Sequence, residues 1–264
     1  MRLVVLCDNN TFIDNYLLGE PAVSFYIENG EDKVLFDLGY SDVYIRNAQK
    51  LGLELANVKK IVFSHGHDDH TKGIEYFNFN SKPEIYYCGS CFQQKRSGNV
   101  DISCPYTEKE MNKIGKTTKI EAVTRISPNL YVLGNIPRKY KTDTIGLEVF
   151  EDGKWVVDEF SDDTAMVYDG VDGLVIITGC SHSGICNIVE YASEHFHKKI
   201  NCVIGGFHLL ELNQFACDSI KALKKFKIRT LYPSHCTSLH VKAEMIAQGM
   251  NVKECGSGLE LNIE

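Results

Sequence analysis

The stretch VFSHGHDDHTKG, residues 62–73, places three histidines and two aspartates directly behind a short apolar run. Three imidazoles and two carboxylates buried together without partners would be unfavourable, because burial penalises the charged form of each group. A bound cation resolves this conflict, since neutral imidazole and ionised carboxylate are ordinary ligands for zinc, manganese and iron. The stretch therefore predicts a metal site at the end of a strand.

The spacing of these residues predicts two metal positions. His65 and His67 are two residues apart, so in extended backbone both imidazoles point the same way. Asp69 and His70 follow where the chain turns toward a helix, and adjacent residues at a turn can reach a second point nearby. Two neighbouring cations can share a water and lower its pKa, which gives a hydroxide nucleophile near neutral pH. The alternative is a solvated polar loop, which the H-x-H-x-D-H pattern behind an apolar strand disfavours.

The composition limits the class of protein. With 264 residues and 44% hydrophobic content, the chain can bury a large core. Its net charge of -7 argues against a general nucleic-acid or membrane-surface binder, so we expect a small-molecule partner and leave the oligomeric state open. Residues 1–10 are more typical of a first strand than of a secretory leader. Ten cysteines without such a leader indicate reduced thiols, and we expect a cytoplasmic protein.

Strand and helix patterns alternate along the chain, which favours an α/β fold with a sheet covered on both faces. The predicted strands cover residues 2–7, 22–28, 32–39, 59–65, 173–180, 201–208, 230–235 and 258–263. The predicted helices cover residues 43–53, 71–77, 184–196, 215–226 and 241–250. Residues 84–145 are less regular, and we interpret them as an elaboration on the main fold. Since no repeat or low-complexity linker interrupts the pattern, we expect a single domain over residues 1–264.

The sequence resembles the metallo-β-lactamase superfamily, whose signature is H-x-H-x-D-H after a strand. The similarity extends over nearly the whole chain, through VLFDLG (34–39), GNIPR (134–138), GLVIITGCSHSGICNIV (173–189), GGFHL (205–209) and YPSHCT (232–237). The resemblance implies an αββα sandwich, with two sheets between outer helices. It also places Asp37 at a strand end, where it supports the metal loop. Within the superfamily, these motifs are similar to the branch labelled 7,8-dihydropterin-6-yl-methyl-4-(β-D-ribofuranosyl)aminobenzene 5'-phosphate synthase-like.

The resemblance further implies a histidine, a bridging aspartate or cysteine, and a final histidine at later strand ends. In ITGCSHSG (177–184), Cys180 stands where the bridging aspartate is common, and His182 follows in the turn. We favour His182 as a ligand, while Cys180 is either a ligand or a small buried thiol. His235 in YPSHCT is the expected last ligand. The predicted ligands of two divalent ions, zinc first and manganese or iron as alternatives, are His65, His67, Asp69, His70, His182 and His235.

Two further residues are candidates for handling a substrate. His208 follows two glycines in GGFHL and is interpreted as a ligand, a phosphate contact or a general acid. Arg138 in GNIPRKYK suits bidentate phosphate recognition, with a solvated basic turn as the alternative. We expect Asp69 to bind metal and to help orient the attacking water.

The predicted function is a dinuclear metal-dependent hydrolase that uses a metal-bound hydroxide on a phosphorylated small molecule. Phosphodiesters and cyclic phosphates, including pterin-related ones, are the expected substrates. The alternatives are an iron-binding redox protein and a non-catalytic metal-dependent sensor on the same fold. Diiron members of the superfamily usually carry glutamate at the signature position that His67 occupies here, which argues against the redox alternative.

A group of cysteines in the less regular segment raises the question of a cluster. Cys88 and Cys91 form a C-x-x-C, and Cys104 precedes a proline. A ferredoxin-type cluster needs a fourth cysteine at suitable spacing, which is missing here. A redox pair or a structural zinc is conceivable, but we favour reduced structural thiols and predict no iron–sulfur cluster. His195, His197 and His240 lack any partner pattern and are predicted to be surface residues.

Overall fold

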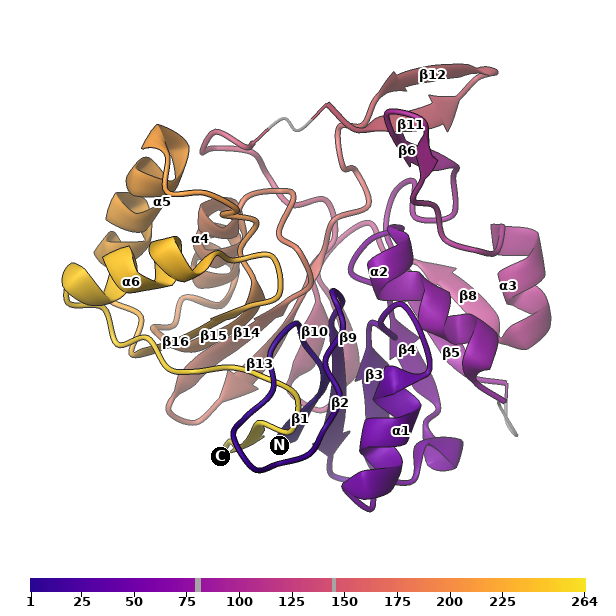
Figure 1. Ribbon diagram of the computed structural model, residues 1–264, viewed down its shortest axis with the longest axis horizontal. Coiled ribbons are helices and arrows are strands. Elements are labelled where there is room, and N and C mark those ends of the chain that lie inside the picture. The colour runs from indigo at the N-terminus through magenta and orange to yellow at the C-terminus, as the bar shows by residue number, and fades with distance from the viewer. Residues whose placement is uncertain (79–81, 144–145) are drawn as a thin grey trace.

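Two large β-sheets lie back to back at the centre of the fold, with helices outside them (Figure 1). The computed structural model describes residues 1–78, 82–143 and 146–264. The first sheet contains, in spatial order, β17 (Glu260–Asn262), β1 (Arg2–Cys7), β2 (Ser24–Asn29), β3 (Asp32–Phe36), β4 (Lys60–Val62), β5 (Glu84–Tyr87) and β8 (Lys116–Lys119). The second contains β16 (Thr230–Ser234), β15 (Ile200–Gly206), β14 (Gly173–Thr178), β13 (Ala165–Gly170), β10 (Leu130–Val132) and β9 (Thr124–Ser127).

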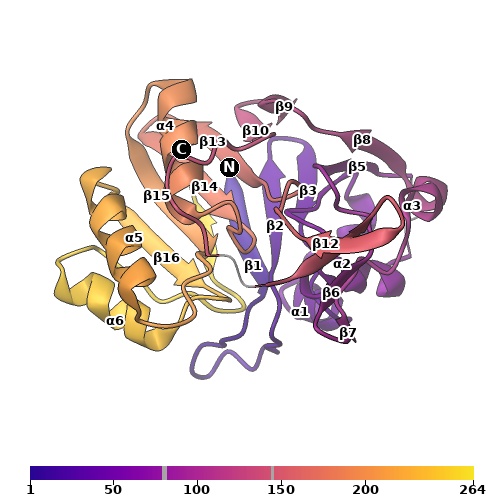
Figure 2. The same cartoon turned by 90° about the horizontal axis from the view of Figure 1, so that it is seen from above.

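Each sheet has a parallel part whose strands are joined by helices. In the first sheet β3, β4, β5 and β8 are parallel, and in the second β14, β15 and β16 are parallel. The connecting helices on the first sheet are α1 (Val43–Lys50), α2 (Asp68–Thr71) and α3 (Glu108–Ile114). Those on the second are α4 (Ile185–Phe196), α5 (Gln214–Lys225) and α6 (Leu239–Ala247). The view from above shows the two helix layers on opposite sides of the paired sheets (Figure 2).

The central strands of both sheets are apolar on both faces because both faces are buried. In β1, Leu3 and Val5 belong to the core between the two sheets, whereas Val4 and Leu6 belong to the core beneath α1 and α3. A third core lies between the second sheet and α4, α5 and α6. The unbroken apolar run of β1 thus follows from its position between two layers.

The αββα sandwich that the resemblance implies is confirmed. The expectation of a sheet covered on both faces is confirmed for each large sheet, which has helices on one face and the other sheet on the opposite face. A strand buried by a helix and a strand buried by a second sheet carry the same apolar signal. Among the described residues, none of the helices combines the length and the apolar character needed to cross a bilayer.

The interpretation of residues 84–145 as an elaboration is wrong in part. β5 and β8 extend the first sheet, while β9 and β10 extend the second; residues 144 and 145 lie outside the described residues. β8 has the sequence KTTK and half-exposed or exposed side chains, so it carries no apolar pattern. β13, AMVYDG, was also missed, although it pairs with β14 along its full length.

Part of the segment is an elaboration, because a separate four-stranded sheet lies outside the sandwich. It contains β12 (Lys154–Val157), β11 (Glu148–Glu151), β6 (Lys95–Ser97) and β7 (Val100–Asp101), and its β11–β12 hairpin projects at one edge (Figure 1). The segment after β7 contacts the signature stretch: the Asp68 N–H donates to the Ile102 carbonyl at 2.9 Å, and His67 forms a β-bridge with Ser103. α2 begins at Asp68, three residues before the predicted helix start, so His70 lies within its single turn.

Replacing Phe36 tests the core between the two sheets. Phe36 is fully buried and stacks on Phe25 of the neighbouring strand, with ring centroids 6.1 Å apart. We expect Phe36→Ala to lower the free energy of unfolding by about 3–5 kcal/mol, because the removed ring leaves a cavity. Urea unfolding in the presence of a chelator measures this. Val171→Ala, at a side chain that is 88% exposed, should change the free energy by less than about 0.5 kcal/mol. Equal effects of the two substitutions would contradict the core assignment.

Candidate metal centre

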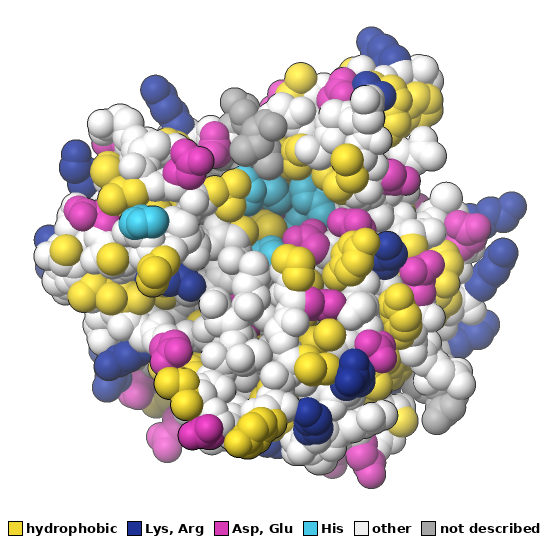
Figure 3. Space-filling view, viewed as in Figure 1, with side chains coloured by type: hydrophobic (Ala, Val, Ile, Leu, Met, Phe, Trp, Pro, Cys, Tyr) yellow, Lys and Arg dark blue, Asp and Glu magenta, His cyan; other side chains and the backbone are white. Residues whose placement is uncertain are grey.

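The predicted ligands meet where the carboxyl ends of parallel strands from both sheets lie together. The signature stretch follows β4, and Cys180 and His182 follow β14. His208 follows β15, and His235 follows β16. The space-filling view shows histidine side chains gathered in a hollow near the centre of this face (Figure 3). Residues that are more than a hundred positions apart in the sequence thus form one site.

His65, His67 and His182 form a compact set, named here the three-histidine group. One ring nitrogen from each lies within 4.8 Å of the others, and all three side chains are buried. Among the residues that the structure describes, none provides a hydrogen bond to Nε2 of His65, to Nε2 of His67 or to either ring nitrogen of His182. A buried nitrogen without a partner has lost its water and gained nothing in exchange. Such nitrogens aimed at a common point fit a metal ion.

Electrostatics keep the three-histidine group neutral. Burial lowers the pKa of His67 to about 3, since the charged imidazole would lose its hydration. Burial, reinforced by the neighbouring imidazoles, likewise holds the pKa of His65 and of His182 well below the ordinary value. At neutral pH the rings therefore have a free lone pair for a cation.

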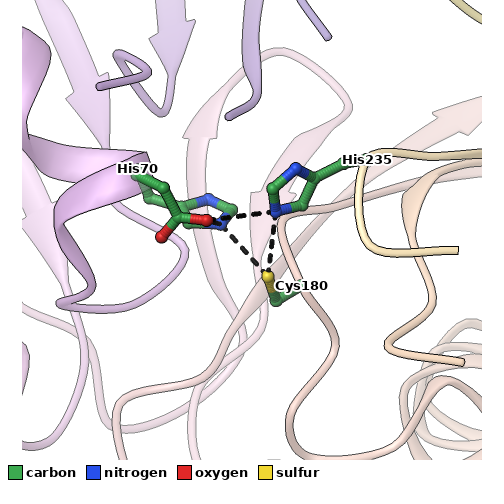
Figure 4. A group of neighbouring side chains, drawn as sticks. His70, Cys180 and His235 are labelled. Carbon is green, nitrogen blue, oxygen red and sulfur yellow. Dashed lines mark hydrogen bonds and ion pairs between the residues drawn. The ribbon is translucent and has the colours of Figure 1, made fainter. Parts of the chain in front are cut away.

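Asp69, His70, Cys180 and His235 form a second set, named here the mixed group (Figure 4). The Cys180 Sγ lies 3.1 Å from Nε2 of His70 and 3.3 Å from Nε2 of His235. The Oδ2 of Asp69 lies 3.5 Å and 3.3 Å from the same two nitrogens. The sequence left Cys180 and His182 as competing candidates, and the structure places them in different groups.

The mixed group differs from the three-histidine group in charge. Burial alone would lower the pKa of His70, but the carboxylates of Asp69 and Asp37 outweigh burial and hold that pKa well above the ordinary value. Burial would raise the pKa of Asp69, yet His70 and His235 keep it well below its usual range. These opposing shifts show that the mixed group attracts positive charge, which a metal ion would supply in place of protons.

Asp37 lies directly behind the mixed group, at the position that the resemblance implies. Its Oδ2 contacts the Nδ1 of His70 at 2.7 Å and accepts from the Ser64 hydroxyl at 2.7 Å. Its Oδ1 accepts from the Ser64 N–H, also at 2.7 Å. The pairing with Nδ1 directs the Nε2 of His70 toward Cys180, as is common for metal-binding histidines.

Sequence reasoning missed two residues that hold His235. The Asp8 Oδ2 accepts from the His235 N–H at 2.9 Å, and the Asn9 Oδ1 lies 3.0 Å from the His235 Nδ1. Both residues directly follow β1. A polar pair behind a buried strand is the signal that was available, but in the sequence it also fits an ordinary turn.

A cavity of about 400 Å³ opens to solvent beside both groups. Its wall includes His67 and His182 of the three-histidine group, and Asp69, Cys180 and His235 of the mixed group. Two ions held by these groups would therefore face a single bound molecule.

His208 also lines this cavity but belongs to neither ligand group. Its ring lies beside that of His182, with centroids 4.4 Å apart, and its backbone N–H donates to the Cys236 Sγ at 3.3 Å. Of the three roles considered for His208, this position fits a substrate contact or a general acid better than a metal ligand.

Arg138 is directed elsewhere. Its guanidinium donates to the carbonyl oxygens of His182, Glu159 and Phe160 at 3.2, 3.0 and 2.9 Å. It is not among the residues that line the cavity. The structure therefore does not support the predicted phosphate contact of Arg138, since these hydrogen bonds fix the loop that carries His182.

The cysteines of the C-x-x-C lie inside the fold. Cys88 belongs to the core between the sheets, and Cys91 and Cys104 belong to the core beneath the helices of the first sheet. Burial raises the pKa of Cys88 to about 12 and that of Cys104 to about 11, which fits inert thiols. That they hold no iron–sulfur cluster stays a prediction. His195, His197 and His240 are exposed, as predicted.

Sequence comparisons agree with the geometry. A family model of the metallo-beta-lactamase superfamily matches residues 18–90. The chain is 32% identical over 236 residues to an uncharacterized protein of Methanocaldococcus jannaschii, covering 88% of this chain and 89% of that protein. It is 28% identical over 264 residues to the 7,8-dihydropterin-6-methyl-4-(beta-D-ribofuranosyl)-aminobenzene-5'-phosphate synthase of the same organism, covering 92% of this chain and 89% of that protein.

Solved structures share the fold. The crystal structure of a metal-dependent hydrolase of the beta-lactamase superfamily superposes with a TM-score of 0.89 at 32% identity, covering 100% of this chain and 99% of that one. Zn(2+)-bound PqqB from Methylobacterium extorquens has the same fold at 13% identity, with a TM-score of 0.61 and coverage of 99% and 100%. From its signature, its sandwich and these relatives, the chain belongs to the metallo-β-lactamase superfamily.

Proposed function

We propose that the protein is a hydrolase with a dinuclear metal centre and that its substrates are small phosphoesters. The observation that carries the proposal is the pair of ligand groups that open onto one cavity. Two adjacent ion positions beside an open cavity suit the displacement of a leaving group from phosphorus.

The two ligand groups differ in the charge that they would offer to their ions. The three-histidine group supplies three neutral nitrogens, whereas the mixed group supplies a carboxylate, two imidazoles and the Cys180 thiol. Nitrogen and thiolate ligands favour zinc, while manganese prefers oxygen-rich sites. We therefore assign zinc to both positions.

The residues around the cavity have separate tasks in the proposed reaction. Bound ions would supply Lewis-acid charge and lower the pKa of the attacking water. The Oδ2 of Asp69 lies against His70 and His235, which leaves its other oxygen to accept a proton from that water and orient it. His208, at the cavity wall, would donate a proton to the leaving oxygen. Pro21, Leu147 and Leu210 would cover the apolar part of the substrate.

The substrate class is supported by chemistry and by one relative. Two adjacent cations suit an anionic phosphoryl group better than a neutral ester. The name of the related synthase specifies a pterin-linked ribofuranosyl 5'-phosphate. We propose phosphodiesters and cyclic phosphates, a pterin-linked one among them, as substrates of this chain. Its ten cysteines and acidic balance support a cytoplasmic location without a nucleic-acid or membrane partner.

Elemental analysis tests the two ion positions. The purified wild-type chain should carry about two zinc ions, one for each ligand group. His65→Ala should lose the ion of the three-histidine group, and Asp69→Ala should weaken the ion of the mixed group. His195→Ala, at an exposed histidine, is the matched control and should keep both ions. Full metal retention in both site variants would rule out the ligand assignment.

Cobalt substitution tests whether Cys180 is a ligand. A cobalt–thiolate bond gives a charge-transfer band in the near ultraviolet, which imidazole and carboxylate ligands do not give. We expect this band in the wild type and its loss in Cys180→Ser, with the visible bands of the three-histidine ion retained. Cys236→Ser is the control, because Cys236 lines the same cavity but lies outside the ligand groups. If the band is lost in Cys236→Ser and kept in Cys180→Ser, Cys236 is the thiolate ligand and Cys180 is not.

A substrate panel tests the chemistry. Phosphodiesters, cyclic phosphates, lactones, β-lactams and thioesters should be compared with zinc or manganese added, and phosphodiesters should turn over. Asp69→Asn should abolish most of this turnover. His208→Ala should lower kcat about 100-fold for poor leaving groups and far less for nitrophenolate, which needs no proton. His240→Ala should match the wild type. Efficient lactone or thioester cleavage without phosphoester turnover would overturn the substrate class.

A further inference from the structure

Two adjacent aspartates just before β13 connect the loops that carry the three-histidine group. The Asp162 Oδ2 accepts from the backbone N–H of Gly66 at 2.8 Å. Gly66 is the residue between His65 and His67. Asp163 uses its Oδ2 to accept from the Ser183 N–H at 2.8 Å and from the Ser183 hydroxyl. Ser183 directly follows His182, so this dipeptide contacts both loops.

The contacts of Asp162 hold a peptide that has little room to move. The next residue but one, Thr164, donates its N–H to the Ser64 carbonyl at 2.8 Å and joins the same loop. A Cβ added to Gly66 would lie 2.0 Å from the Cys91 carbonyl oxygen, so the loop backbone packs directly on Cys91. Because a single residue separates the two histidines, fixing the peptide between His65 and Gly66 restrains the backbone from which both imidazoles extend.

Asp162 is also part of a buried charge cluster. Lys95 Nζ lies 3.3 Å from Asp162 and 2.5 Å from Asp158, and all three side chains are almost completely buried. Burying charges costs desolvation free energy, which pairing offsets only in part, so the cluster is weak evidence for stability. Only Asp162 of its two carboxylates reaches the Gly66 N–H, whereas Asp158 accepts from the Phe160 N–H.

The mixed group is held by different residues. Asp37 contacts Nδ1 of His70, Asp8 accepts from the N–H of His235, and Asn9 contacts the ring of His235. Among the described residues, neither Asp162 nor Asp163 hydrogen-bonds to a member of the mixed group. The two ion positions therefore have separate supports.

We propose that Asp162 and Asp163 are positioning residues that act selectively on the three-histidine ion. They contact neither the ligand nitrogens nor the cavity, and they act by fixing Gly66 and Ser183. This inference rests on the proposed dinuclear function. Loss of either carboxylate lowers the affinity for the three-histidine ion by about 10–100-fold and leaves the affinity of the mixed group unchanged.

Cobalt titration of the full chain against a competing chelator separates the two ions. The thiolate charge-transfer band reports occupancy of the mixed group through Cys180. The visible absorption of cobalt, after subtraction of the part that changes together with the thiolate band, reports the three-histidine ion. In Asp162→Ala and in Asp163→Ala, the chelator concentration that halves the thiolate band should equal that of the wild type. The chelator concentration that halves the absorption of the three-histidine ion should fall by about 10–100-fold. Asp162→Asn, which keeps an oxygen acceptor for Gly66, should recover most of the affinity.

Asp158→Ala is the matched control. It removes the other carboxylate beside Lys95 and leaves one ion pair, as Asp162→Ala does, but it keeps the bond to Gly66. The control should lower the melting temperature of the metal-free chain about as much as Asp162→Ala. It should weaken the three-histidine ion far less than Asp162→Ala does, since Asp158 reaches that group only through Phe160. Should Asp162→Ala not fold, Asp163→Ala carries the test alone.

Two results would overturn the positioning role: equal weakening of both ions by the Asp162 and Asp163 variants, or equal weakening of the three-histidine ion by Asp158→Ala. Unchanged affinity in Asp163→Ala would also count against it. A wild-type chain that binds no cobalt would instead overturn the proposed function, and the positioning role with it. If the wild type binds two ions and the Asp162 and Asp163 variants weaken both ions equally, only the positioning role is overturned.

Discussion

The buried carboxylate of Asp37 joins the first sheet to the metal site. Its two oxygens contact the N–H and hydroxyl of Ser64 and the Nδ1 of His70. These contacts connect the end of β3, the loop after β4 and the single turn of α2, and they do so where water is excluded. A hydrogen bond to a charged acceptor is strong in such surroundings. The direction of His70, and through it the shape of the mixed group, depends on this one side chain.

A division of charge follows from how the two groups are built. Neutral rings surround one ion position, whereas a carboxylate and a thiol surround the other. If both positions carried anions, an empty site would repel itself; if both were neutral, two bound dications would be poorly compensated. The asymmetry lets one site tolerate both the empty and the occupied condition. It also explains why the imidazoles of the two groups shift their pKa in opposite directions.

The sandwich fold and most of the metal ligands could be predicted from the sequence, because the ligands follow buried strands at chemically specific spacings. What could not be predicted depends on local backbone direction. Cys180 and His182 are two residues apart, which suggests a choice between them, but Ser181 has a left-handed φ of 67° that turns the chain and sends the two side chains to different groups. The charge of Arg138 was visible in the sequence, whereas its three carbonyl acceptors were not, since they come from distant segments.

The ligands and the outer wall of the cavity come from different kinds of segment. The ligands are held at the ends of core strands, where hydrogen bonds from buried carboxylates leave little freedom. The outer wall includes Pro21, Leu147 and Leu210, which belong to three surface loops. Loops tolerate substitution and changes of length far better than core strands. Descendants of such a chain can therefore acquire new substrates by altering these loops, while the inherited metal chemistry passes unchanged from one lineage to the next.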